Sequence, residues 1–350
     1  MSAQEPVDEF LKRVEAVEDR SRRLQDDIAL RWVNDEIGTI DTDLHALPTS
    51  VQQTRTRGYV FKSYLERKTE VLAQQWVETR PRITAAADEF SRELRYQSDL
   101  FQQRLPFLRY NRSEVELSAA ESALQDLDSR VSSAKGTLQG MYRTLMDNVR
   151  QTVDQVKEIG WVLDQVDGAT FKLYPGECIV SAVKAQWMTS EKEGPKGILY
   201  LTDERVLFEQ EEEVATKKVL FIATEKRKLQ ELKWDAPLSQ IEAIKASEKG
   251  GAILGIGKKE ILEFDFGDNV RVRSALLRLE ADSDMWQALL GRVKSGDISN
   301  ERTAPKDQAA VKAARAAPTQ CAVCGAIIAQ PIVRGMTEVK CEYCGTIIRL

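Results

Sequence analysis

The apolar residues of this 350-residue chain change their spacing near Gly168. Before this glycine they recur at intervals of three and four residues, which is typical of helices packed along one face. After it they alternate with a period of two, which is typical of β-strands. Because the two patterns occupy separate blocks, the sequence predicts a multidomain α + β protein with a helical region at 1–168 and a sheet domain at 169–297.

The helical region predicts long helices with few interruptions. Its apolar pattern shifts phase between Ile28 and Val33, which resembles a coiled-coil stutter. Pro48 is expected to end the first helix, and a capping box starting at Ser50 is expected to begin a second one that runs to about Leu105. Pro81 should kink this second helix.

A third helix is predicted after a turn at 106–112, opened by a capping box at Ser113 and Glu116. Its apolar residues follow the clearest heptad spacing in the chain: Leu117, Ala120, Leu124, Leu127, Val131, Ala134, Leu138, Met141 and Leu145. Three long helices with short connections predict an elongated antiparallel coiled-coil bundle. Two interpretations stay open: a stalk that forms a homo-oligomer or binds a partner through residues 1–168, and a bundle closed within one chain.

The sheet domain predicts seven or so antiparallel strands followed by one amphipathic helix. The expected strands are 176–187, 197–202, 205–208, 217–224, 229–234, 241–246, 261–266 and 269–273. The helix is expected at about 283–294, with Trp286, Leu289, Leu290 and Val293 on one face. This is the outline of a pleckstrin-homology (PH) β-barrel with a C-terminal helix.

Three runs in this domain resemble the GRAM and bacterial PH-like group. They are Gly176-Glu177, the run from Gly197 to Phe208 that contains Leu-Thr-x-x-Arg-x-x-Phe, and the run from Trp234 to Ile241. The resemblance covers about 130 residues. It implies a domain that binds phosphoinositides or other membrane lipids in some members of the group, and peptides in others.

An anionic lipid or partner would need several cations on neighbouring loops. The candidates are Lys217, Lys218, Lys226, Arg227, Lys228, Lys258, Lys259, Arg271 and Arg273. The acidic residues Glu209 and Glu211 to Glu213 come directly before the first of these and would oppose such a site. The alternative is that these cations are solvated residues of strand edges and loops.

Four of the five cysteines form two Cys-x-x-Cys-Gly repeats, Cys321 with Cys324 and Cys341 with Cys344, separated by sixteen residues. Four thiolates at this spacing predict one tetrahedral Zn²⁺ per chain, and the glycine after each pair allows the sharp turn around the metal. Two disulfides or four free thiols are the alternative. The run at 320–350 resembles a zinc ribbon, a structural module that binds proteins or nucleic acids. A polar, alanine-rich linker, either flexible or partly helical, is expected at 298–319.

The motifs that would indicate catalysis are incomplete. His45 is the only histidine and lies in a helical stretch, where a surface or packing role is the simplest explanation. The glycine-rich run 251–259 lacks the glycine and the hydroxyl residue of a phosphate-binding loop, because Ala252 and Lys259 stand there. Cys178 is a lone cysteine in an apolar strand, where it is expected to fill the core. We therefore expect a protein that is not an enzyme.

The net charge of −5 argues against non-specific coating of nucleic acid. The chain lacks an apolar run long enough to span a membrane and lacks the pattern of a signal peptide at its start, so a cytoplasmic protein is expected, possible also at the inner face of a membrane. The combined expectation is an adaptor or scaffold with protein partners and peripheral contact with anionic lipid. The alternatives are a nucleic-acid-associated protein that reads through its zinc ribbon and an enzyme with an unrecognised site.

Overall fold

The computed structural model describes residues 5–190, 193–219, 222–249, 259–268, 270–307, 309, 320–326, 328, 333, 336 and 338–349. Two compact units divide the chain, one formed by Met1–Ser50 with Leu65–Gln155 and the other by Val51–Tyr64 with Val156–Leu350. The division falls inside the last long helix, before the change of period at Gly168. The final turns of that helix therefore group with the sheet.

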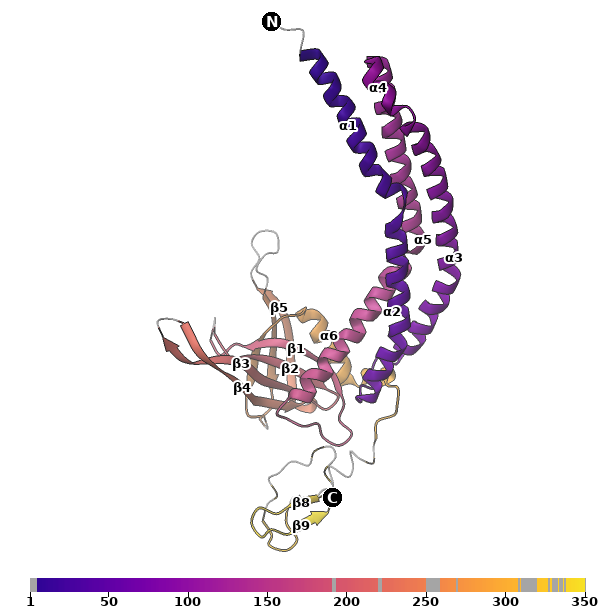
Figure 1. Ribbon diagram of the computed structural model, residues 1–350. Coiled ribbons are helices and arrows are strands. Elements are labelled where there is room, and N and C mark those ends of the chain that lie inside the picture. The colour runs from indigo at the N-terminus through magenta and orange to yellow at the C-terminus, as the bar shows by residue number, and fades with distance from the viewer. Residues whose placement is uncertain are drawn as a thin grey trace. The chain divides into compact units, whose positions relative to one another are not determined.

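Five helices precede the sheet (Figure 1): α1 Glu5–Ile28, α2 Arg31–Thr56, α3 Tyr64–Gln102, α4 Leu105–Asn111 and α5 Glu114–Gly168. Hydrogen bonds within the first unit give their directions. Gln25 of α1 bonds to Ser98 of α3, and Ser21 bonds to Gln102, so these two helices are antiparallel. Arg13 and Arg20 of α1 bind α5 residues that are each 108 positions later, so α1 and α5 are parallel. The predicted long N-terminal helices are present, but the first of the three predicted helices is divided into α1 and α2.

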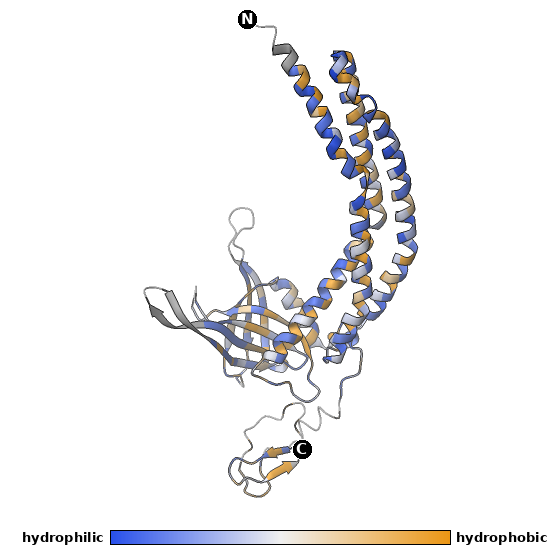
Figure 2. Cartoon of the chain, viewed as in Figure 1, coloured by the Kyte–Doolittle hydropathy of each residue, from blue (hydrophilic) through white to orange (hydrophobic). Residues whose placement is uncertain are grey.

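The core of this unit consists of the apolar stripes of its own helices, as the hydropathy colouring in Figure 2 illustrates. Leu117, Leu124, Leu127, Val131 and Leu138 of α5 are all buried. Because the heptad positions are already covered by helices of the same chain, the structure favours the closed bundle over a stalk that associates through this stripe. Self-association through residues 1–168 would need another surface.

The helix boundaries differ from the prediction around the two prolines. Pro48 lies inside α2 and does not end it, and the predicted cap at Ser50 is wrong because α2 continues to Thr56. A single proline loses one backbone hydrogen bond, which the packing of neighbouring apolar residues can offset. The interruption lies instead at Leu30, whose φ of 48° ends α1 where the sequence suggested a stutter.

The segment predicted as a turn after Pro106 is the short helix α4. Its proline occupies the first turn, where the missing backbone N–H costs nothing. The predicted cap of the next helix is confirmed, since the Glu116 N–H donates to Ser113 Oγ at 3.3 Å. Pro81 lies within α3 without ending it.

The sheet contains seven antiparallel strands: β1 Ile179–Trp187, β2 Lys196–Thr202, β3 Arg205–Val219, β4 Ile222–Pro237, β5 Ile241–Lys249, β6 Lys259–Phe266 and β7 Ser274–Leu279. Their order is β4-β3-β2-β1-β7-β6-β5. The predicted antiparallel pairing is confirmed, with seven strands where eight runs were predicted, but the prediction of a closed barrel is not. Within the described strands, β4 pairs only with β3 and β5 only with β6, so the sheet is open.

Two predicted strands are misplaced. The run 217–224 spans the end of β3 and the start of β4, which form one long hairpin. The run 269–273 precedes β7, which occupies Ser274–Leu279. In both places short apolar runs alternate with charged residues, so the local pattern does not fix the point where the chain reverses.

One face of the sheet is packed with aromatic side chains. The Trp234 ring stacks on Phe208 with centroids 6.0 Å apart, and Phe264 stacks on Phe266 at 5.6 Å. Helix α6, Ser283–Ser295, buries Trp286, Leu290 and Val293 as predicted. Asp282 caps its start by accepting the Met285 N–H, and Gly296 ends it with φ of 86°. These contacts pack the aromatic face of the sheet and fix both ends of α6.

The chain after α6 stays attached to the sheet unit beyond the predicted linker boundary at 298. A 3-10 helix, Asp297–Glu301, follows α6. Arg302 then pairs with Asp203 at 2.8 Å, and the Thr303 N–H donates to the Val60 carbonyl at 2.8 Å. Residues 310–319 of the predicted linker lie outside the described residues. Among the helices that are described, none has the length and hydrophobicity needed to cross a membrane.

Candidate metal centre

The two cysteine repeats fold into nearly identical turns. In the first, the Gly325 N–H donates to the Cys321 carbonyl at 2.8 Å, and the Cys321 N–H donates to the Ala326 carbonyl at 2.8 Å. In the second, Cys341, Gly345 and Thr346 repeat these bonds at 2.9 and 2.8 Å. Both glycines have positive φ, 71° and 74°, as the sequence predicts. Each turn therefore directs two sulfur atoms to the same side.

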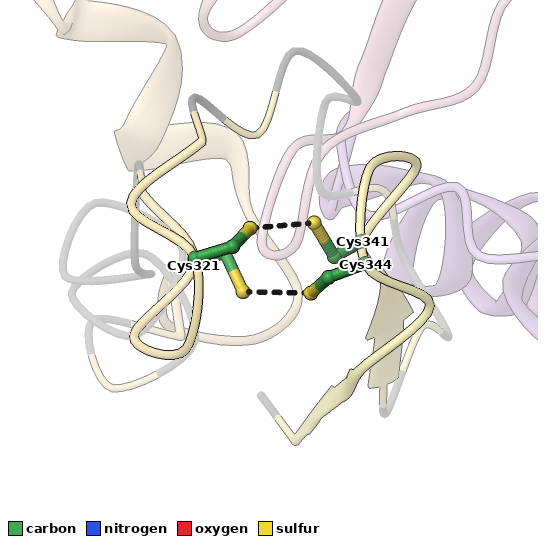
Figure 3. Close-up of side chains that lie close together, drawn as sticks. Cys321, Cys341 and Cys344 are labelled. Atoms are coloured by element: carbon green, nitrogen blue, oxygen red, sulfur yellow. Dashed lines mark hydrogen bonds between the residues drawn. The ribbon is translucent and has the colours of Figure 1, made fainter.

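The turns face one another and bring the four thiols together (Figure 3). The sulfur atoms of Cys321, Cys324, Cys341 and Cys344 all lie within 4.8 Å of one another. Two cross-turn distances, Cys321 to Cys344 and Cys324 to Cys341, are 3.6 Å. A tetrahedral ion with metal–sulfur bonds of about 2.3 Å would separate its ligands by about 3.8 Å. The geometry is thus compatible with one metal ion held by four thiolates.

The surroundings of the cysteines favour a metal over an apolar core. Cys321 and Cys341 are buried, and Val339 is the other buried side chain among the described residues of 320–349. We call this segment the metal module; its paired strands are β8, Glu338–Lys340, and β9, Ile347–Arg349. So little apolar burial cannot stabilise a fold of this size, whereas a bound metal can.

Thr346 tunes one of the four thiols. Its Oγ1 lies 3.2 Å from Cys344 Sγ. Hydrogen bonding with the Thr346 side chain and backbone lowers the pKa of Cys344. The pKa of Cys324 is lowered by a backbone hydrogen bond at Ala326 but is raised overall by hydrogen bonds with the other cysteines. The lower pKa of Cys344 favours its thiolate, which is the form that binds metal.

Two of the predicted lipid-binding cations lie at opposite ends of one strand. Lys259 opens β6, whereas Arg273 lies beside Phe266 at the other end of that strand. Eight residues of strand place these ends about 24 Å apart, too far for one headgroup. Arg271 is exposed, and the exposed Arg273 has Asp268 at 3.8 Å.

Other predicted cations lie on the β3–β4 hairpin. Lys228 forms an ion pair with Glu211 at 2.6 Å. Glu211 is one of the acidic residues that were expected to oppose a lipid-binding site, and it does contact one of the predicted cations. The strands place Lys217, Lys218, Lys226 and Arg227 near the hairpin end, where the side chains lie outside the described residues. Lys258 and most of the glycine-rich run 251–259 are also outside them. Contact with anionic lipid therefore stays a prediction.

The runs that resemble the GRAM group form a buried ion-pair network. Glu177 is fully buried, and its carboxylate accepts Arg205 Nε at 2.9 Å and the Thr202 hydroxyl at 2.7 Å. Arg205 also donates to Asp235 at 2.9 Å, and its guanidinium lies 3.8 Å from the centre of the Tyr174 ring. Burial lowers the pKa of Arg205, but the hydrogen bond and charge of Glu177 outweigh burial and leave it raised. This ion-pair network links β2, β3 and β4, so its charged groups stabilise the fold.

His45 and Cys178, for which the sequence predicts a surface or packing role, lie on a helix and in the core of the sheet unit. His45 is exposed on α2, with its Nδ1 2.7 Å from the Asp41 carbonyl of the same helix. Cys178 is buried, as predicted, and Arg302 Nη2 lies 3.6 Å from its sulfur. This arginine contact could not be predicted from the sequence, because it joins positions 124 residues apart.

No protein-family model and no curated protein matches the chain. Among solved structures, it is similar to the C-terminal domain of an unknown protein from Leishmania infantum, with 13% identity, 34% of this chain and 85% of that chain covered, and a TM-score of 0.20.

It is also similar to the truncated linker-DH/PH domains of p115-RhoGEF, with 12% identity, 82% and 98% of the two chains covered, and a TM-score of 0.22. A third similar structure is the DH/PH fragment of PDZ-RhoGEF in complex with human RhoA, with 11% identity, 82% and 95% covered, and a TM-score of 0.24. Similarity at these scores carries no argument for the fold or function of this chain.

Proposed function

We propose that this chain is a non-enzymatic protein-interaction scaffold whose metal module is a zinc ribbon that docks to a protein. The observation that carries the proposal is the exposure of apolar side chains on that module. Val323 and Tyr343 occupy equivalent positions, each directly before the second cysteine of its turn, and are 71% and 79% exposed. Ile347 on β9 is 58% exposed. Apolar exposure on so small a module is typical of a binding surface.

The chemistry of the metal site supports a structural role. Four protein thiolates fill the coordination sphere of Zn²⁺ and leave no position for a substrate or a water molecule. The buried network around Arg205 is likewise closed, since its charged groups contact one another. The residues best able to do chemistry are thus engaged in holding the fold, which supports a non-enzymatic scaffold.

The sheet unit is proposed as a second docking domain of the GRAM or PH-like type, at a cytoplasmic site or the inner face of a membrane. Two contacts on one chain would raise the affinity of each once the other forms. The separation of Lys259 from Arg273 favours a protein over a membrane as the partner of the loops between its strands.

The double substitution Val323→Ser and Tyr343→Ser tests the docking surface. Both side chains are exposed and neither is a metal ligand, so we expect the variant to keep its metal and its fold. Proteins that co-purify specifically with the wild-type chain should be lost. Quantitative mass spectrometry of affinity-purified complexes measures this. A matched control is Tyr110→Ser, which removes an equally exposed aromatic residue from the helical unit.

Retention of the same co-purifying proteins by the double variant would overturn the proposed surface. A variant that loses its metal would instead show that these positions contribute to the module's fold. Metal content is therefore measured on the same samples.

A further inference from the structure

A groove of about 300 Å³ lies in the helical unit, between α4 and the first turns of α5. Buried Leu105 and Leu108 of α4 line one side of it. The α5 side consists of small side chains that recur at helical spacing: Ala119, Ala120 and Ala123. We call this hollow the α4–α5 groove. Its apolar, alanine-lined wall leaves room for a side chain from outside the unit.

Helix α1 packs against the other side of these two helices and leaves the α4–α5 groove uncovered. Arg109 of α4 and Glu121 of α5 each form an ion pair with α1, at 2.7 and 2.8 Å. The groove residues Asn111 and Ala123 each follow one of these by two positions, which is a rotation of about 200° around a helix. The groove therefore opens on the side of α4 and α5 that faces away from α1.

Exposed apolar side chains of the helical unit are concentrated around this opening. Phe107 lines the groove and is 62% exposed, and Val115 lies one turn before Ala119 on α5 and is 80% exposed. Other large apolar residues exposed in the same stretch of chain are Tyr96, Leu100 and Tyr110. Among the described residues of this unit, Val77 is the one large apolar side chain that is exposed elsewhere. Such a concentration marks an interaction site.

The charged residues that line the α4–α5 groove are one cation, Arg104, and one carboxylate, Glu116. Within the described ranges, the Arg104 side chain has no hydrogen bond or ion pair, and the Glu116 carboxylate accepts the Asn111 amide at 3.3 Å but has no cationic partner. The neighbouring Arg109, by contrast, is paired. A groove with one free charge of each sign is complementary to a surface that presents the same two charges in reverse.

We propose that a second copy of this chain docks here, with Phe107 of each copy seated in the α4–α5 groove of the other. In a two-fold contact each residue meets the counterpart of its own partner, so Arg104 of each copy faces Glu116 of the other. One patch thus holds an aromatic side chain, the hollow that receives it, and both charges, which makes it complementary to itself. The heptad stripe of α5 is covered within the chain, so this patch supplies the other surface that self-association needs.

The size of the contact sets its strength. Two aromatic side chains bury about 300–500 Å² together, and the groove walls that they cover bury a comparable area. With the flanking Leu100 and Val115, the contact reaches about 1,000 Å², at the lower end of specific interfaces. We therefore expect a dimer that dissociates in the micromolar range and closes at two copies.

Sedimentation velocity of the full chain loaded with Zn²⁺ tests the dimer. From low micromolar to several hundred micromolar chain, the average mass should rise from one chain to two. Phe107→Ser should stay monomeric over this range, because it removes the side chain that fills the groove. Val77→Ser is the matched control, since it removes an exposed apolar residue of α3 outside the patch, and it should dimerise like the wild type. Circular dichroism checks that each variant keeps its helices.

Charge reversal tests the pairing of the two copies. Arg104→Glu alone brings two carboxylates together at each pair, and Glu116→Arg alone brings two cations together, so each variant should dimerise about tenfold more weakly. An equimolar mixture of the two variants should recover dimerisation, because both contacts of the mixed pair are then between opposite charges. A fold defect in either variant would not be repaired by mixing.

The proposal is overturned if the wild type stays monomeric at every concentration, which would leave the groove to a different protein. It is also overturned if Phe107→Ser dimerises as the wild type does, since the copies would then meet elsewhere, or if the mixture is no better than the single variants. The metal module takes no part in this contact, so each of these outcomes leaves its proposed docking role standing.

Discussion

Replacing Cys321 and Cys344 by serine is expected to abolish metal binding and to unfold residues 320–349. The two residues come from different turns, so their loss removes half of the ligands and the link between the turns. Structural Zn²⁺ contributes about 10–16 kcal/mol of apparent binding free energy in zinc-finger peptides. Nothing in the described part of the module could replace that, because Val339 is its one buried side chain besides the two cysteines.

The measurement is metal content per chain by plasma mass spectrometry, together with amide exchange of the module. Wild type should hold one Zn²⁺, and the exchange of 320–349 should be slow with metal and fast in the double variant. Cys178→Ala is the matched control, since it removes the cysteine that lies apart from the cluster, and it should keep one Zn²⁺. Stoichiometric metal in the double variant would contradict the ligand assignment.

Substituting Arg205 by methionine is expected to destabilise the sheet unit by about 3–5 kcal/mol, the usual effect of removing one partner from a buried ion pair. The side chains of Arg205 and Glu177 are 6% and 0% exposed. Without the guanidinium, the Glu177 carboxylate would remain buried with only the Thr202 hydroxyl and the backbone N–H of Tyr174 to compensate its charge. Urea unfolding followed by tryptophan fluorescence measures the loss, because Trp187 and Trp234 lie in this sheet.

Two further variants serve as controls for the effect of Arg205→Met on stability. Arg273→Met removes an arginine whose ion pair with Asp268 is almost fully exposed, and it should leave the urea midpoint unchanged. The double variant Glu177→Leu with Arg205→Met removes both charges, so it should recover much of the lost stability. An Arg205 variant as stable as wild type would mean that the ion pair does not hold these strands together.

Features set by neighbouring residues could be predicted from the sequence. The spacing of the cysteines and the glycine after each pair determine the two turns, and the heptad residues of α5 determine its buried face. The cap at Ser113 followed from its contact with a residue three positions later. In each case the decisive interaction lies within one turn of the chain.

Features set by distant contacts could not be predicted in the same way. Pro48 is tolerated inside α2, where its neighbours Leu47 and Val51 are buried, and that burial is not visible in the local sequence. The ends of β3 and β7 depend on register with their partners. Even where residues were singled out correctly, as with Arg205, the sequence did not show that they bind one another; Glu177 lies 28 residues away.

The row formed by Lys196, Gln186 and Arg278 across β2, β1 and β7 illustrates the same limit. Lys184, Lys196 and Arg278 are separated by up to 94 positions and belong to no charge run. The sequence pattern therefore indicated the adjacent lysines of the hairpin instead. Candidate binding residues on a sheet are therefore judged better by strand register than by adjacency in sequence.

X-ray absorption at the zinc edge of the full chain tests most directly the claim that the cysteine cluster is a closed structural site. A closed site predicts four sulfur ligands at about 2.3 Å and no lighter atom bound to the metal. A spectrum with an oxygen or nitrogen ligand, or with three sulfurs or fewer, would contradict it, because the ion would then have a position open to water or substrate.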